Sequence, residues 1–277
     1  MNLSLYWLAF SCFAAAFVLH LYFLKNKNYL SRRFSLPIMG TGFALLTIFM
    51  YSRGSAVGAC PIGNPFEIIV FIFWTSLLIY LLVALFFSVN YLGFFSAGMI
   101  AVAMVLVRLF PALDYAYGEG HINSSAIVGM HASLAVFSYG VFALLSVLGI
   151  MYLVQFYGLS KRRTGSFFTF LPSLTQLEHL QTWVLSTGLF LLTLSLFVGS
   201  FIYLYDLGEV PHYKLSFTVL VWLMYFVFLV LRLLKRLFSS KYAWSVIIGF
   251  LVALLALIPV DRARQDLAPH GESEIMG

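Results

Sequence analysis

The chain is 277 residues long, of which 62% are hydrophobic, 18% aromatic and only 9% charged. Soluble globular domains average roughly 45–50% apolar and about 25% charged residues. With a mean hydropathy of +0.98, this chain has too few charges to build a water-soluble surface. The composition therefore excludes soluble enzymes, DNA-binding domains, disordered tails and disulfide scaffolds, and it predicts a protein that lies in a bilayer.

The basic balance of the chain does not indicate a nucleic-acid partner, although the formal net charge is +6 and the pI is about 9.3. In membrane proteins an excess of Lys and Arg marks the cytoplasmic boundary. The two cysteines are too few for a disulfide framework or a zinc cluster. Cys12 falls in an apolar run and Cys60 in a loop, so we expect two unrelated thiols.

Eight apolar runs divide the chain, and each approaches the length of about 20 residues that a membrane-spanning helix needs. They are 5–24, 37–52, 67–88, 91–110, 126–157, 180–204, 215–234 and 243–260. The predicted fold class is an all-α integral membrane protein with about eight transmembrane helices. Pro37 is predicted to open the second run, and the fifth run is long enough to tilt or to project beyond the hydrocarbon.

The positions of the basic residues predict the orientation. The first run has no basic residue before it, and four follow it: Lys25, Lys27, Arg32 and Arg33. This order is the reverse of a cleavable signal peptide, so we expect the run to remain as a helix. The predicted inner loops are 25–36, 89–90, 158–179 and 235–242. With these loops inside, nine of the ten acids, all but Glu178, lie outside. The positive-inside rule then predicts both termini on the outer side.

Few ionisable residues lie deep within a run. Arg108 and Arg232 are close to the ends of their runs, and Glu67 opens its run at the outer interface. A proton-coupled transporter or a voltage sensor normally needs charge near the bilayer midplane. This pattern disfavours a transporter, which stays open as an alternative. Small residues in the sixth run, Ser195 and Gly199 among them, predict close helix packing.

The histidines are the first candidates for chemistry because imidazole is well suited to ligate haem iron. His131 lies about five residues into the fifth run and His212 directly precedes the seventh, so the predicted topology places both at the outer face. His20 and His179 fall near the inner boundary. Two outer imidazoles could clamp an iron porphyrin if their helices are neighbours; alternatively they are half-solvated interfacial residues. The sequence contains no HExxH, P-loop, GxGxxG or nucleophile elbow.

Four stretches in a characteristic order carry a family resemblance. They are CPIGNPFEIIVFIFWTSLLIYLLV (60–83), GMHASLAVFSYGVF (129–142), LEHLQTWVLSTGLFLLTLSLFVG (177–199) and HYKLSFTVLVWLMYFVF (212–228). Together they resemble the cytochrome c assembly family, often labelled CcsA, ResC or HemX-like. The resemblance implies a cytochrome c assembly-type transmembrane domain over 60–262. A two-helix membrane segment over 1–59 precedes it, and 263–277 is expected to be a disordered tail.

The resemblance also implies a function and partners. Members of the family are polytopic proteins that handle haem for cytochrome c maturation, which implies haem b as the bound group and a bacterial plasma membrane as the location. The implied partners are haem, a CxxCH-bearing apocytochrome c and a separate membrane protein with a large extracytoplasmic domain. His131 matches the family's first outer histidine and His212 is similar to the second, so both are axial-ligand candidates for the haem iron. Glu67 and Trp74 match recurring positions to which we assign no role.

The outer loop before His212 departs from the synthases of the family. Those proteins carry a platform of the form W-G-x-x-W-x-W-D-x-K-E, where this chain has YLYDLGEVPHYK (203–214). Tyr203 and Tyr205 are the residues left to stack on a porphyrin. The short loop is similar to the HemX-like branch and favours a haem-binding accessory with no assigned catalytic residue. The alternatives are a membrane scaffold or regulator without a bound cofactor, and a small-molecule transporter.

Overall fold

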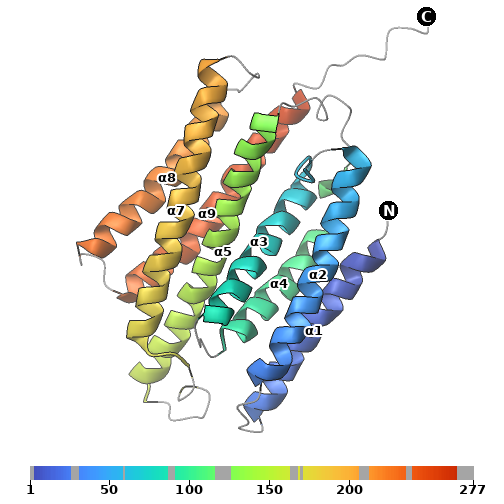
Figure 1. Ribbon diagram of the computed structural model, residues 1–277. Helices are drawn as coiled ribbons and strands as arrows, with labels where there is room; N and C mark the ends of the chain where they lie inside the picture. Colours follow the sequence, from blue (N-terminus) through green and yellow to red (C-terminus); the bar gives the residue numbers. More distant parts are fainter. Residues whose placement is uncertain are drawn as a thin grey trace, which may run out of the picture.

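The computed structural model describes residues 3–25, 31–58, 60–86, 91–115, 126–162, 168, 171–205, 212–234 and 239–266. Within these ranges the chain forms eight α-helices, one short 3-10 helix and no strand (Figure 1). The helices are α1 (Leu3–Lys25), α2 (Ser31–Val57), α3 (Pro65–Phe86), α4 (Leu92–Arg108), α5 (Ala126–Ser160), α7 (Leu174–Leu204), α8 (His212–Leu233) and α9 (Ser239–Asp266), with η1 (Pro111–Leu113) after α4. Each of the eight predicted runs coincides with one helix, which confirms the all-α prediction.

Six helices are long and apolar enough to cross a membrane: α1, α2, α3, α5, α7 and α8. Helix α4 and the Ser240–Ala256 stretch of α9 are also apolar but shorter. The prediction of a multi-pass membrane protein is therefore confirmed. The full count of eight crossings and the outer location of both termini stay predictions.

The start of α3 shows how the local sequence sets a helix boundary. The Oδ1 atom of Asn64 accepts a hydrogen bond of 2.9 Å from the backbone N–H of Glu67, and the Glu67 carboxylate accepts one of 2.9 Å from the N–H of Gly63. This pairing is close to a capping box, with Pro65 at the first helical position, where its missing N–H costs nothing. The cap therefore holds Glu67 at the end of the helix.

The start of α2 corrects one predicted boundary. The helix begins at Ser31, and Pro37, which we expected to open it, lies inside. A proline within a helix removes one backbone hydrogen bond, here the bond to the carbonyl of residue 33. Ser35 and Met39 on either side of Pro37 are buried in the bundle. Tertiary packing of this turn therefore outweighs the loss of that bond.

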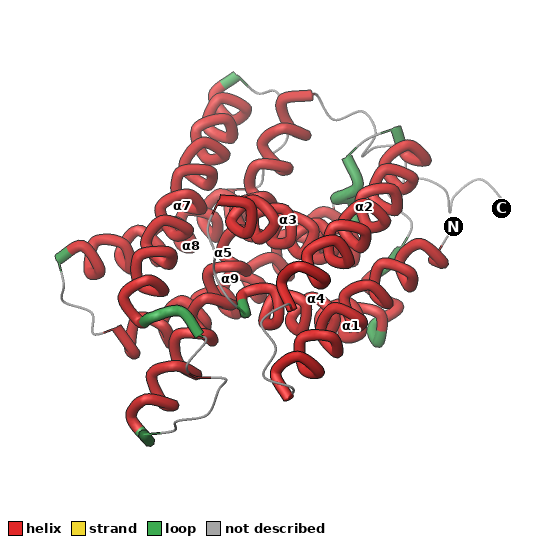
Figure 2. The backbone as a smooth tube through the Cα atoms, turned by 60° about the horizontal axis from the view of Figure 1, so that its bottom comes forward, coloured by secondary structure: helices red, strands yellow, loops and turns green. Residues whose placement is uncertain are grey.

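Helix α5 is the centre of the bundle. Its 35 residues span about 50 Å at 1.5 Å per residue, and it packs against α3, α4, α7 and α9, with α7 forming its most extensive interface. Helices α1, α2 and α4 lie on one side of the bundle, and α7 and α8 lie on the other (Figures 1 and 2). The N-terminal turns of α5 and the C-terminal turns of α7 meet at one end, where His131 is located.

Candidate functional site

His131 lies in the second turn of α5 and faces α7. Its Nδ1 atom is 2.7 Å from the backbone carbonyl oxygen of Ser195 and 3.1 Å from the Ser195 Oγ. The Ser195 hydroxyl donates a hydrogen bond of 3.0 Å to the backbone carbonyl of His131. Each residue thus bonds the backbone of the other through its side chain, and the pair joins α5 to α7.

The contact with the Ser195 carbonyl determines the proton on the neutral imidazole. A carbonyl oxygen only accepts hydrogen bonds, so Nδ1 must carry the hydrogen and Nε2 then has the free lone pair. The His131 side chain is half-buried. A half-buried imidazole in this tautomer, oriented by a backbone carbonyl, is the usual arrangement of a histidine that binds a metal through Nε2.

Gly199 forms the wall beside the imidazole. It lies one helical turn after Ser195, and a β-carbon built on it would come within 2.7 Å of the His131 Cε1 and 2.9 Å of its Nδ1. These separations are well below van der Waals contact, so the ring occupies the space that any other residue at 199 would take. The small residues predicted to permit close helix packing therefore also hold the histidine.

The other predicted site residues do not join this arrangement within the described part of the chain. Tyr205 stacks on Phe201, with ring centroids 5.9 Å apart. At 100° per residue these rings lie on a different face of α7 from Ser195 and Gly199. His212 is the first residue of α8 and Tyr203 lies near the end of α7, and for these two residues the structure describes the backbone alone. His131, His212, Tyr203 and Tyr205 therefore all stay predictions as haem-binding residues, and His131 is the one for which the structure describes contacts between α5 and α7.

The remaining histidines fall into two groups. The Nδ1 of the buried His20 donates to the carbonyl of Ala16 at 2.7 Å. The Nε2 of His179 accepts a hydrogen bond of 2.9 Å from the indole of Trp183, which occupies the atom that would bind a metal. His121 and His270 lie outside the described residues. Within those residues, no group of three or more His, Cys, Asp or Glu side chains could hold a metal ion.

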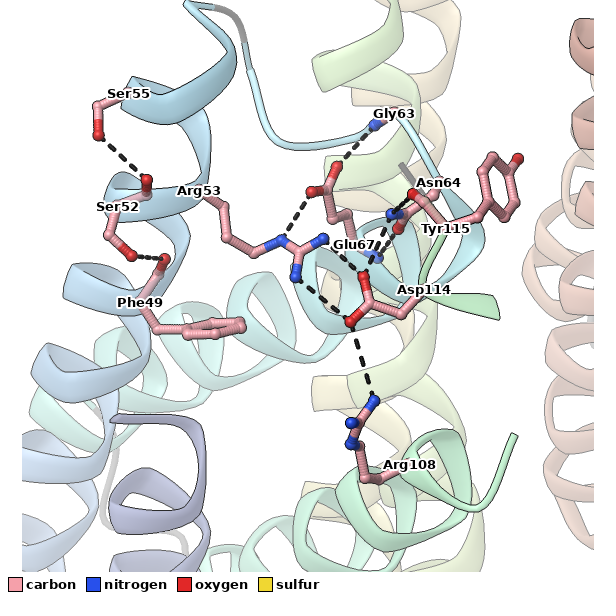
Figure 3. Close-up of polar contacts among 10 residues, drawn as sticks. All are labelled: Phe49, Ser52, Arg53, Ser55, Gly63, Asn64, Glu67, Arg108, Asp114 and Tyr115. Carbon is pink, nitrogen blue, oxygen red and sulfur yellow. Dashed lines mark hydrogen bonds and ion pairs between the residues drawn. The ribbon is translucent and has the colours of Figure 1, made fainter. Parts of the chain in front are cut away.

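A second polar cluster lies at the same end of the molecule, around Arg53 (Figure 3). The Arg53 guanidinium, on α2, donates to the Glu67 carboxylate through Nε and to the Asp114 carboxylate through Nη2, both at 2.7 Å. Asn64 donates to the carbonyl of Tyr115 at 2.8 Å and to Asp114 at 3.4 Å. These contacts join the end of α2, the start of α3 and the segment after η1.

The Arg53 cluster is almost fully removed from solvent. The side chains of Arg53 and Glu67 are 6% and 2% exposed, and that of Asp114 is 10% exposed. The guanidinium carbon also lies 5.1 Å from the centroid of the Phe66 ring. Buried charges persist only when they are paired and hydrogen-bonded, and here every charge has a partner. No role was predicted for Glu67 from its position in the sequence, where the only signal for this pairing is the presence of charges at the outer ends of successive runs.

The two cysteines do not form a disulfide bridge with each other. Cys12 and Cys60 are both free, which confirms the prediction of two unrelated thiols. Cys60 is exposed and accepts a hydrogen bond of 3.5 Å from the hydroxyl of Ser133, two residues after His131. The loop between α2 and α3 therefore lies beside the turn of α5 that carries the histidine.

Comparison with known proteins identifies the family to which this chain belongs. Residues 62–265, well over half of the chain, match the model of the cytochrome C assembly protein family. The chain belongs to this family.

Three relatives of this family member place it more closely. It is 28% identical to Protein HemX of Brevibacillus brevis over 195 residues, which cover 70% of this chain and 71% of that protein. It is 26% identical to Protein HemX of Bacillus subtilis (strain 168) over 200 residues, with the same coverage. It is 24% identical to cytochrome c biogenesis protein CcsA of Chlamydomonas reinhardtii over 247 residues, 84% of this chain and 67% of that protein. The protein is a HemX-like member of the family, as the short outer loop predicted.

Proposed function

We propose that the protein holds haem as a cargo at the outer membrane face during cytochrome c biogenesis, with His131 as a ligand of the iron. Membership of the cytochrome c assembly family and the CcsA relative support a role in this biogenesis. The outer face follows from the proposed orientation, with both termini outside a bacterial plasma membrane.

One observation carries the proposal: the Nδ1 of His131 is engaged by a backbone carbonyl at 2.7 Å. The neutral ring then presents Nε2, which is the nitrogen that haem-binding histidines supply to iron. His131 as a residue is half-buried, and its contacts with α7 orient the ring. The donor atom and its tautomer therefore fit an axial ligand.

His212 is proposed as the second ligand. Helix α7 ends at Leu204, five residues beyond Gly199, and α8 begins at His212. The short connection of residues 205–211 keeps the backbone of His212 at the same end of the bundle as His131. Tyr203, near the end of α7, and Tyr205, directly after it, are proposed to flank the porphyrin.

The proposed part of this chain is binding and orientation. Bound haem supplies the vinyl groups to which the thiols of a CxxCH motif become attached. The chain would hold the iron through imidazole nitrogens and orient the cargo for apocytochrome c. A separate membrane partner with a large extracytoplasmic domain would receive the apocytochrome, and we assign no catalytic acid or base to this chain.

The test is an absorption spectrum of the detergent-purified protein, oxidised and then reduced with dithionite, with a pyridine haemochrome assay for stoichiometry. We expect a Soret band and sharp reduced α and β bands, which His131→Ala and His212→Ala each abolish. His179→Ala is the matched control, because this histidine lies at the opposite end of α7 with its Nε2 engaged by Trp183, and its spectrum should match that of the unaltered protein.

A colourless protein that also fails to take up added haem would overturn the proposal. The family fold would then serve a scaffold or regulator without a bound cofactor. Uptake of a small solute that changes in His131→Ala, with no haem spectrum, would favour a transporter.

A further inference from the structure

We infer that Ser195 and Gly199 are positioning residues for His131, which together hold the imidazole in one orientation with Nε2 as its available donor atom. The inference rests on the proposed function, because it assigns the two residues that prepare the proposed ligand. It also gives a reason for the small side chains of Ser195 and Gly199 at the point where α5 approaches α7.

Ser195 acts on the ring through two of its oxygen atoms. Its backbone carbonyl accepts the Nδ1 hydrogen at 2.7 Å, and its Oγ lies 3.1 Å from the same nitrogen. The hydroxyl hydrogen is directed to the His131 carbonyl at 3.0 Å, so the Oγ lone pairs face the ring. Ser195 is fully buried, and water therefore does not compete for these bonds.

Gly199 makes this use of the Ser195 carbonyl sterically feasible. In an α-helix the carbonyl of residue 195 already accepts the N–H of residue 199, and its second lone pair remains for another donor. The imidazole reaches that lone pair across the α-carbon of residue 199. A β-carbon there would lie 2.7 Å from Cε1 and 2.9 Å from Nδ1, so the ring fits only against glycine.

A larger residue at 199 would have a specific consequence. The ring would rotate or withdraw from α7, and the hydrogen bond from Nδ1 to the Ser195 carbonyl would lengthen or break. The neutral imidazole would then exchange between its two tautomers, and Nε2 would lose its constant direction. Outer-shell partners that orient a ligating histidine typically change metal affinity roughly 10–100-fold when they are altered.

The test compares Gly199→Ala with a steric control. In Gly42→Ala the new β-carbon would lie 2.7 Å from the Cε1 of Phe13, which is the same clash with a ring in the α1–α2 pair. Gly129→Ala, two residues before His131 with nothing within 4 Å of its new β-carbon, controls for glycine removal near the site. The melting temperatures of all three variants show whether a change in haem affinity is caused by destabilisation of the fold.

Haem titration of the apoprotein in detergent is the first measurement. We expect Gly199→Ala to weaken haem binding about 10–100-fold and to shift the reduced α band. Ser195→Ala keeps the carbonyl acceptor and should weaken binding less. Gly42→Ala should lower the melting temperature while its haem affinity stays at the unaltered value. Equal haem affinity and an equal spectrum in Gly199→Ala would overturn the inference.

Selective ¹⁵N-histidine NMR of the apoprotein is the second measurement and needs no haem. His131, assigned by its loss in His131→Ala, should give the shifts of a single Nδ1–H tautomer, and Gly199→Ala should give averaged shifts. The two hypotheses then fail separately. A protein that never binds haem but keeps this NMR difference overturns the proposed function alone, and a haem-binding protein with no NMR difference overturns the positioning role alone.

Discussion

At the scale of residues, the charge of Arg53 is important for stability, because one guanidinium neutralises two nearly buried carboxylates. Its replacement by Gln would leave Glu67 and Asp114 facing each other without a full counter-charge. Removing one partner of a buried ion pair typically costs about 3–5 kcal/mol. We therefore expect Arg53→Gln to lower the free energy of unfolding by about that amount, as measured by denaturation in detergent micelles.

Arg108 provides the matched control at the same carboxylate. Its Nη1 lies 3.8 Å from the Asp114 Oδ2, and its side chain is 27% exposed. Because this ion pair is long and partly exposed on the Arg108 side, solvent screens it, and ion pairs screened in this way contribute about 0–1 kcal/mol. Arg108→Gln should therefore have a small effect, although it removes the same charge. Equal losses for the two variants would contradict the view that burial makes Arg53 important.

At the scale of elements, two helix pairs use the same side-chain clasp. In α2 and α3 the indole of Trp74 donates to the Thr47 hydroxyl at 2.8 Å, and in α7 and α8 the indole of Trp222 donates to the Thr193 hydroxyl at 2.8 Å. Each threonine in turn donates to the carbonyl four residues earlier in its helix. Trp74 matches a recurring position of the family by sequence. Its hydrogen bond to Thr47 shows that it joins α3 to α2.

The two clasps predict additive effects. Hydrogen bonds between membrane helices contribute about 0.6 kcal/mol on average, so Trp74→Phe and Trp222→Phe, which remove the donor and keep an aromatic ring, should each cost about that much. The clasps share no residue and join different helix pairs. Effects at independent sites usually add, and the double variant should therefore lose about the sum. A loss clearly larger than the sum, in the same denaturation assay, would show that the two pairs are coupled.

Hydropathy predicted the helices because a membrane span must be a continuous apolar helix, which leaves a signal in every residue of the run. The boundaries were less accurate where packing decided them, as at Pro37. The residues that contact His131 were not predictable from the sequence. Each span is apolar on every side, so its pattern does not indicate which face packs against which neighbouring helix. His131 was found by its residue type, whereas its contacts with Ser195 and Gly199 depend on how α5 and α7 are paired.

At the scale of the whole molecule, the distribution of Lys and Arg predicts which end faces the outside of the cell, and this orientation can be tested. Cys60 is exposed in the connection between α2 and α3, and its contact with Ser133 places it at the same end as His131. With that end outside, a membrane-impermeant maleimide should label Cys60 in intact cells. Cys12, partly buried within α1, should remain unlabelled, and a Cys60→Ser variant provides the blank.

Lys161 tests the opposite end of the molecule in the same labelling experiment. It is exposed just after α5, and in a Cys60→Ser background Lys161→Cys should be labelled only after the membrane is permeabilised. The opposite pattern, with Cys60 protected and Lys161→Cys labelled in intact cells, would invert the molecule and place His131 at the cytoplasmic face. A haem held there would be directed toward a cytoplasmic partner, so this result would separate the location of the proposed cargo site from its chemistry.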